Sequence, residues 1–234
     1  MLNDLPKKEK KKKDYSNPTK WQLFWRIQKE CLRRAVTPYL MYLFMSLLLL
    51  ASQTITINGS NALAIVLGIL CIAGGAFFNG HLCYHYGILH YGAYAAGCLH
   101  RKNAAYGIQS GGDHRPEREY RIWKGPLIGL YVGIPVIVFG ILAGSLMGNA
   151  QSWMYYAFAM FAGYAIIPIT WFGTRPEGGL VASPYYSILF VLLSVIVSAI
   201  FYYVGAMHER KTREEAAARA EKVEEAGKRA RNKK

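Results

Sequence analysis

Residues 125–148 read GPLIGLYVGIPVIVFGILAGSLMG and carry no acidic or basic side chain. A run of about 20 apolar residues is long enough to cross the hydrocarbon core of a bilayer as a helix. Residues 36–99 also lack Asp, Glu, Lys and Arg. Soluble domains instead scatter charges over their whole length, at about a quarter of all residues. The sequence therefore predicts an all-α, polytopic membrane protein, a helical bundle of five or six transmembrane helices.

The charged residues gather outside these apolar stretches and are mostly basic. The chain has 28 Lys and Arg against 14 Asp and Glu, a formal net charge of +14. The basic residues occupy an N-terminal region, one central loop and a C-terminal tail, as the positive-inside rule leads one to expect. No nucleic-acid-binding module is recognisable, so the predicted partner of the basic ends is a bilayer with anionic headgroups. A cytoplasmic N-terminus follows, and the absence of an organelle signal points to a bacterial plasma membrane.

Four regions follow from this distribution. Residues 1–18 form a disordered basic arm, 19–35 an interfacial amphipathic helix, 36–207 the transmembrane bundle, and 208–234 a charged helical tail. In the interfacial helix one side carries mainly apolar residues, namely Trp21, Phe24, Trp25, Cys31, Leu32 and Ala35, opposite a cationic side. A simple continuation of the first span is the alternative. In the tail, Glu209–Arg213 and Glu215–Arg219 are predicted i,i+4 ion pairs.

The number of crossings depends on residues 79–100, which are uncharged but rich in His and Tyr. Six spans would cover 36–52, 62–79, 82–99, 125–148, 153–172 and 185–207, with a turn at Asn79–Gly80. That arrangement places 21 Lys and Arg inside and 7 outside, whereas five crossings give 18 and 10. The positive-inside rule favours six. The histidines within 82–99 argue against it, because polar groups are costly in lipid.

Five glycines recur along one face of the span 125–148: Gly129, Gly133, Gly140, Gly144 and Gly148. Helices in lipid associate through close backbone approach, which small residues permit. This glycine stripe predicts packing against another helix, in the same chain, in a second copy or in a partner membrane subunit.

The segment 79–100 holds the candidate binding residues. His81 and His85 are four residues apart, so on a helix they share a face and are candidate metal ligands. One helix cannot complete such a site, which needs a second helix or a second copy. Asn79, Tyr84, His90 and Tyr91 are candidates for a polar ligand pocket. The simpler interpretation is that these His and Tyr side chains are amphipathic residues at the membrane interface.

Motifs of enzymes are absent from the sequence. It contains no Walker A loop, HExxH, GxSxG or CxxC pair, and its four cysteines show no disulfide framework. The sequence therefore predicts a non-enzymatic accessory or assembly subunit without a cofactor. The alternatives are a small-molecule transporter or channel subunit, and a metal- or haem-binding redox protein that uses His81 and His85.

Overall fold

The computed structural model describes residues 19–52, 62–106, 115–146, 152–170 and 188–231. Within these ranges every regular element is helical: α1 (Lys20–Ser52), α2 (Ala62–Ala105), the short 3-10 helix η1 (Pro116–Arg118), α3 (Lys124–Leu146), α4 (Ser152–Thr170) and α5 (Leu189–Arg231). Four of them, α1, α2, α3 and α5, are long and apolar enough to cross a membrane. The predicted all-helical membrane fold is confirmed to this extent, and the basic arm 1–18 lies outside the described residues.

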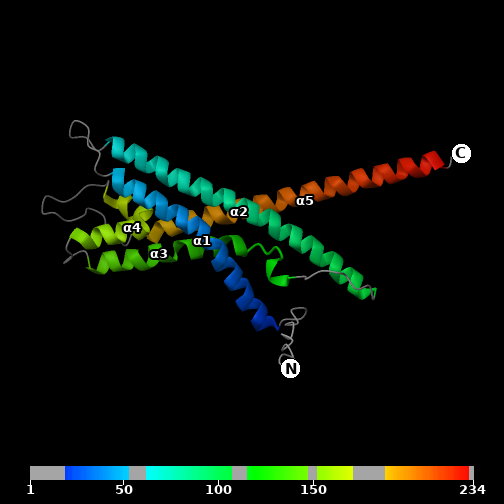
Figure 1. The fold of residues 1–234 in the computed structure, drawn as a ribbon, viewed down its shortest axis with the longest axis horizontal. Helices are drawn as coiled ribbons and strands as arrows, with labels where there is room; N and C mark the ends of the chain where they lie inside the picture. The colour runs from blue at the N-terminus through cyan, green and yellow to red at the C-terminus, as the bar shows by residue number, and fades with distance from the viewer. Residues whose placement is uncertain (1–18, 53–61, 107–114, 147–151, 171–187, 232–234) are drawn as a thin grey trace, which may run out of the picture.

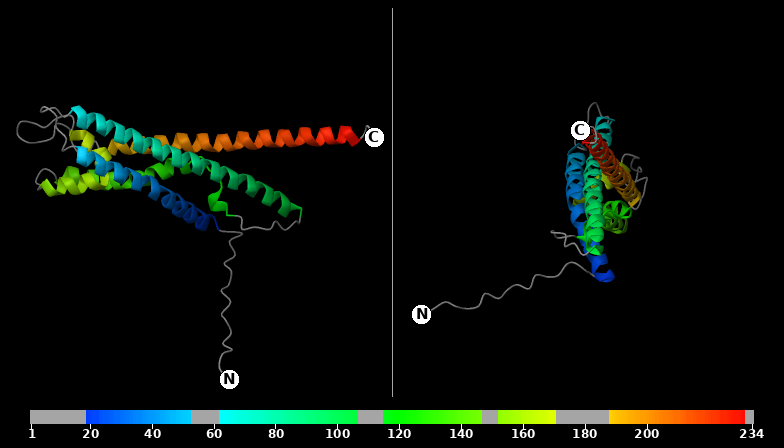
Figure 2. Two further views of the ribbon diagram at one scale, coloured as in Figure 1. Left: turned by 45° about the horizontal axis from the view of Figure 1, so that its top comes forward. Right: turned by 90° about the vertical axis from the view of Figure 1, so that its right-hand side faces the viewer.

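Two helices are much longer than a membrane is thick. α2 has 44 residues and α5 has 43, so each is about 65 Å long at 1.5 Å per residue. A hydrocarbon core of about 30 Å accommodates less than half of either helix. The two run in the same direction, cross, and separate beyond the bundle, with the C-terminal part of α5 projecting alone (Figures 1 and 2).

The turn proposed at Asn79–Gly80 is wrong, because α2 continues through it without interruption. The side chain of Asn79 donates to Ser198 Oγ of α5 at 3.1 Å, and Gly80 lies against the ring of Phe201. Both residues thus belong to a helix–helix contact. The hairpin of spans 62–79 and 82–99, on which six crossings depended, does not form.

Residues 19–35 are likewise not a separate helix, since α1 runs unbroken from Lys20 to Ser52. Ile27, Cys31 and Ala35 are buried in the bundle, whereas Trp21 and Trp25 are more than half exposed. The first half of α1 is therefore the continuation of the first span.

α4 is broken in its middle, at Ala162, whose φ of −138° and ψ of 24° are not helical. α1 binds two backbone groups beside the break: Tyr39 Oη donates to Phe161 O at 3.4 Å, and Tyr164 N donates to Ser46 Oγ at 3.0 Å. Before the break α4 lies against α3. After it, α4 follows α1 back toward the end of the bundle where it began (Figures 1 and 2).

The crossing of α2 and α5 depends on a pair of glycines. A β-carbon at Gly87 would lie 2.2 Å from Tyr202 O, and one at Gly205 would lie 2.0 Å from Tyr84 O. Each glycine therefore lets its helix touch the backbone of the other, which is how small residues act between membrane helices.

Part of the glycine stripe packs in the same manner within the chain. A β-carbon at Gly129 would lie 2.5 Å from Ser194 O, and one at Gly133 would lie 2.4 Å from Val191 Cγ1, so both glycines face α5. Ser194 Oγ also donates to Gly129 O at 2.9 Å. Gly140 is buried, and the surroundings of Gly144 and Gly148 are outside the described part of the chain.

Candidate functional site

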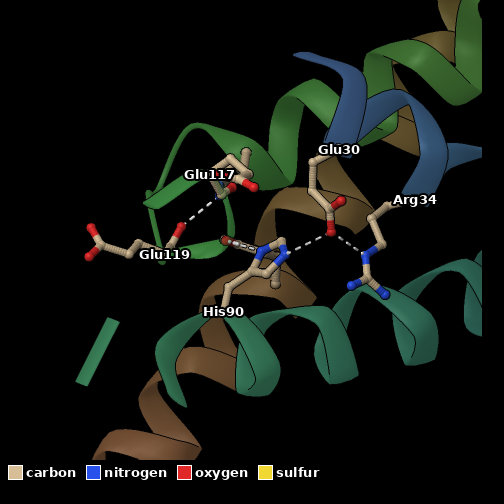
Figure 3. A network of polar contacts seen from close by, with 7 residues as sticks. Glu30, Arg34, His90, Glu117 and Glu119 are labelled. Carbon is tan, nitrogen blue, oxygen red and sulfur yellow. Dashed lines mark hydrogen bonds and ion pairs between the residues drawn. The ribbon is translucent and has the colours of Figure 1, made fainter. Parts of the chain in front are cut away.

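A buried polar cluster joins α1, α2, η1, α3 and α5 on the side of the bundle where α1 begins (Figure 3). Its centre is His90 of α2, which is almost completely buried. His90 Nδ1 and Tyr202 Oη of α5 are 2.8 Å apart and share a hydrogen bond. Two helices that cross at Gly87 are thus also linked by a polar contact one turn further along.

The other side of the His90 ring faces α1. His90 Nε2 lies 4.0 Å from Glu30 Oε1, and the same oxygen accepts a hydrogen bond from Arg34 Nε at 3.0 Å. Arg34 also lies over the ring of Tyr86, 4.8 Å from its centroid. Glu30 is nearly buried, so the guanidinium of Arg34 provides the charge partner that a buried carboxylate requires.

Lys124, the first residue of α3, is completely buried beside η1. Its ammonium group donates to Glu117 O and to Glu119 O, each at 2.6 Å. The carboxylate of Glu119 in turn binds Arg101 Nη1 of α2 at 2.5 Å. This arrangement attaches the segment that precedes α3 to the outer part of α2.

Tyr120 closes the cluster on the same side. Its ring stacks on that of Tyr202 with the centroids 5.5 Å apart, and it also contacts Tyr91. Burial raises the pKa of Tyr120, so its hydroxyl stays protonated at neutral pH. Because Glu30, Glu119 and Lys124 are each bound by partners of the chain itself, the cluster is suited to holding five elements together rather than to receiving a substrate.

The two candidate metal ligands lie elsewhere, on the outer face of α2. His81 and His85 are both exposed, and their Nε2 atoms are 3.2 Å apart. Among the described residues no group of three or more His, Cys, Asp or Glu side chains is placed to hold a metal ion. The structure thus brings these two imidazoles together and adds no third ligand from the described part of the chain.

The residues predicted to line a polar pocket are not gathered in one place. Asn79 is bound to Ser198, and His90 to Tyr202. Tyr84 packs between His85 and His208, whereas Tyr91 contacts Tyr94 and Tyr120. Buried Asn79 and His90 are tied to α5 about three turns of α2 apart, so the four side chains do not form a single binding site.

An apolar groove of about 500 Å³ opens between α1, α3 and α5 near the polar cluster. It is lined by Phe24, Gln28, Trp123, Pro126, Leu127, Leu130 and Val195. Gln28 is its polar lining residue, and the side-chain oxygen of Gln28 accepts a hydrogen bond from the Tyr131 hydroxyl. The groove is therefore suited to hydrocarbon.

Sequence reasoning missed most of the polar cluster. Glu30 is the only acidic residue between residues 15 and 112, and it stands among five basic residues of 20–34. Lys124 occupies the first position of α3, where the helix dipole disfavours a cation. Both are signals that a specific partner is present, but neither identifies that partner.

Comparison with known proteins adds no further constraint on this site. The chain matches no protein-family model, and no curated protein or solved structure is significantly similar to it.

Proposed function

We propose that α1, α2, α3 and α5 cross the membrane and that α4 enters it and returns to the side from which it came. The N-terminal region to Arg34 holds eleven Lys and Arg, residues 100–124 hold six and the tail holds ten, which leaves only Arg175 for the other side. Four crossings thus place 27 of the 28 basic residues on one side, a stronger bias than either five or six crossings gives. That side is the cytoplasm, and the exposed Trp21, Phe24 and Trp25 lie near its headgroups.

Cysteine labelling tests this topology. In a chain whose four native cysteines are replaced by alanine, single cysteines are placed at Tyr106, Arg175 and Ala217. With an impermeant maleimide on intact cells, we expect labelling at position 175 alone, and labelling at 106 and 217 only after lysis. Labelling at position 106 in intact cells would instead support the topology with six crossings, and labelling at position 217 would support the one with five.

We propose that the protein is a non-enzymatic assembly subunit that anchors a partner on the cytoplasmic side through α5. The observation that carries this proposal is the continuation of α5 beyond the bundle. From Arg210 to Arg229 every residue of α5 is exposed. We call residues 209–231 of α5 the C-terminal arm. In it the ion pairs Glu209–Arg213 and Glu215–Arg219, predicted from the sequence, are confirmed at 2.7 and 3.8 Å.

The exposed part of α5 carries its own i,i+4 ion pairs, which stabilise the helix where it leaves the bundle. Four more i,i+4 pairs join Arg210 to Glu214, Lys211 to Glu215, Lys228 to Glu224 and Arg229 to Glu225, and each pair contributes about 0.2–0.5 kcal/mol to helix formation. Val223 is a large apolar side chain on this part of α5, and 73% of its surface is exposed. A preformed charged helix loses little conformational freedom on binding, which favours recognition of a complementary protein surface.

Transport is less well supported. Broken helices within a membrane form substrate sites in many transporters. In α4, however, two backbone groups beside the break at Ala162 are bound by Tyr39 and Ser46 of α1. These two backbone groups are therefore not available to bind a substrate.

Site-specific crosslinking tests the anchoring role. A photoreactive amino acid at Val223 is expected to give one adduct of defined mass in cells, while the same group at lipid-facing Leu192 gives none. Because the C-terminal arm alone would carry the contact, a synthetic peptide of residues 208–231 should compete for the adduct in permeabilised cells. A peptide of the same composition in scrambled order is the control. Equal competition by both peptides, or no adduct at Val223, would contradict the proposal.

A further inference from the structure

We propose that His81 and His85 are one half of a zinc site that a second copy of this chain completes. The proposal concerns the outer face of α2 and is independent of the anchoring role proposed for α5. It rests on the spacing of the two imidazoles, on their exposure, and on the ligands that a four-coordinate metal would still lack.

The spacing of the two rings matches chelation by a single metal ion. With metal–nitrogen bonds of 2.0–2.1 Å, two imidazole nitrogens are about 2.9 Å apart at a right angle and about 3.3 Å apart at the tetrahedral angle. The observed separation of the two Nε2 atoms is 3.2 Å. Coordination through Nε2 requires each ring to carry its proton on Nδ1, which leaves the Nε2 lone pair free for the metal.

Structural zinc sites are almost always four-coordinate, so His81 and His85 provide two of the four ligands. Within the described ranges the chain offers no cluster of three or more ligand side chains. Two further ligands are therefore needed beyond those that the described part of the chain provides. A second copy supplies the same pair of imidazoles with the same spacing.

The surface around the two histidines is suited to a second copy. Exposed side chains form a stripe along this face of α2: Leu70, Phe77, His81, His85 and Leu89. Phe77 stacks near the His81 ring at 6.5 Å, and the ring planes of His81 and His85 are nearly perpendicular. Because copies inserted in one membrane share an orientation, a two-fold axis along the membrane normal pairs each α2 with its counterpart in parallel. Residues at the same level then meet, and four imidazoles surround one position near the axis.

Zinc titration tests the site. The full chain, purified in mild detergent through a tag without histidine, is equilibrated with Zn²⁺, and bound metal and molar mass are measured on the same fraction. We expect one zinc per two chains and a dimer that EDTA dissociates. His81→Ala and His85→Ala should each lower bound zinc at least tenfold. The matched control is His208→Ala, because His208 is also exposed but packs on Tyr84 of the other helix.

A second measurement distinguishes a four-imidazole site from a loosely bound ion. Replacing Zn²⁺ by Co²⁺ should give the intense visible absorption of a four-coordinate cobalt ion, lost in His85→Ala. Thermal unfolding without metal should be unchanged in both exposed variants, so a folding defect cannot imitate the result. Zinc at one per chain on a monomer, zinc retained when both histidines are replaced, or no zinc in the unaltered chain would each overturn the proposal.

Discussion

Replacing Gly205 with alanine is expected to prevent α2 and α5 from crossing. The new methyl carbon would lie 2.0 Å from the carbonyl oxygen of Tyr84, and the three nearest atoms at this point are all backbone atoms, which cannot rotate away. Overpacked cores lose about 1–3 kcal/mol, and a clash against backbone lies at or above that range. We expect Gly205→Ala, and likewise Gly87→Ala, to lower the yield of monodisperse protein and its unfolding temperature in detergent.

The chain contains matched controls for this effect. A β-carbon at Gly227 would meet no atom within 4 Å, and one at Gly74 would lie at an ordinary 3.7 Å from Met45. Alanine at Gly227 should raise helix stability by up to about 1 kcal/mol, since it removes the entropic cost of glycine. If Gly205→Ala behaved like Gly227→Ala, the close crossing of α2 and α5 would not exist in the folded protein.

The fold class could be predicted from the sequence because helices that are able to cross a membrane leave a signal in composition alone. The charge-free runs at 36–99 and 125–148 are long enough to cross a bilayer as helices. Helix continuity could not be predicted, because Asn79–Gly80 is a strong turn signal in water. In the bundle those residues face Ser198 and Phe201, which lie about 120 positions further along the chain.

The break in α4 was missed for a similar reason. Ala162 is a good helix former, and Gly163 is unremarkable in a membrane helix. The hydroxyl groups of Tyr39 and Ser46 bind backbone groups on either side of the break. These partners belong to another helix, so the sequence around Ala162 contains no sign of them.

The polar cluster shows that a count of Lys and Arg residues does not predict which of them bind a partner within the bundle. A count of basic residues treats Lys124, Arg34 and Arg101 as interchangeable charges. In the structure Lys124 is fully buried, and Arg34 and Arg101 each bind one carboxylate. Counting thus places these residues near the membrane surface but does not indicate that they hold η1 and α1 against α2.

Replacing Lys124 with methionine is expected to detach the segment around η1 from the bundle. Methionine keeps most of the apolar length of lysine but cannot donate to Glu117 O and Glu119 O, which lie 2.6 Å from the ammonium nitrogen. An unsatisfied buried carbonyl costs about 1–3 kcal/mol, so two would cost about 2–6 kcal/mol. The bond to Glu117 O is only partly buried, which places the loss toward the lower end of this range. Removing a buried charge recovers part of its desolvation cost, which makes the lower half of that range the expected value.

Hydrogen exchange measures this loss where it occurs. In Lys124→Met, amides of residues 117–124 should exchange at least tenfold faster, while amides at the α3–α5 contact around Gly129 keep their protection. The matched control is Lys211→Met, which removes an exposed lysine whose only described ion pair, with Glu215, is 4.0 Å long. Because exposed pairs contribute at most about 1 kcal/mol, that variant should exchange like the unaltered chain. Unchanged exchange at 117–124 in Lys124→Met would show that the segment is held by Arg101 and Glu119 instead, and that the buried lysine does not fasten it.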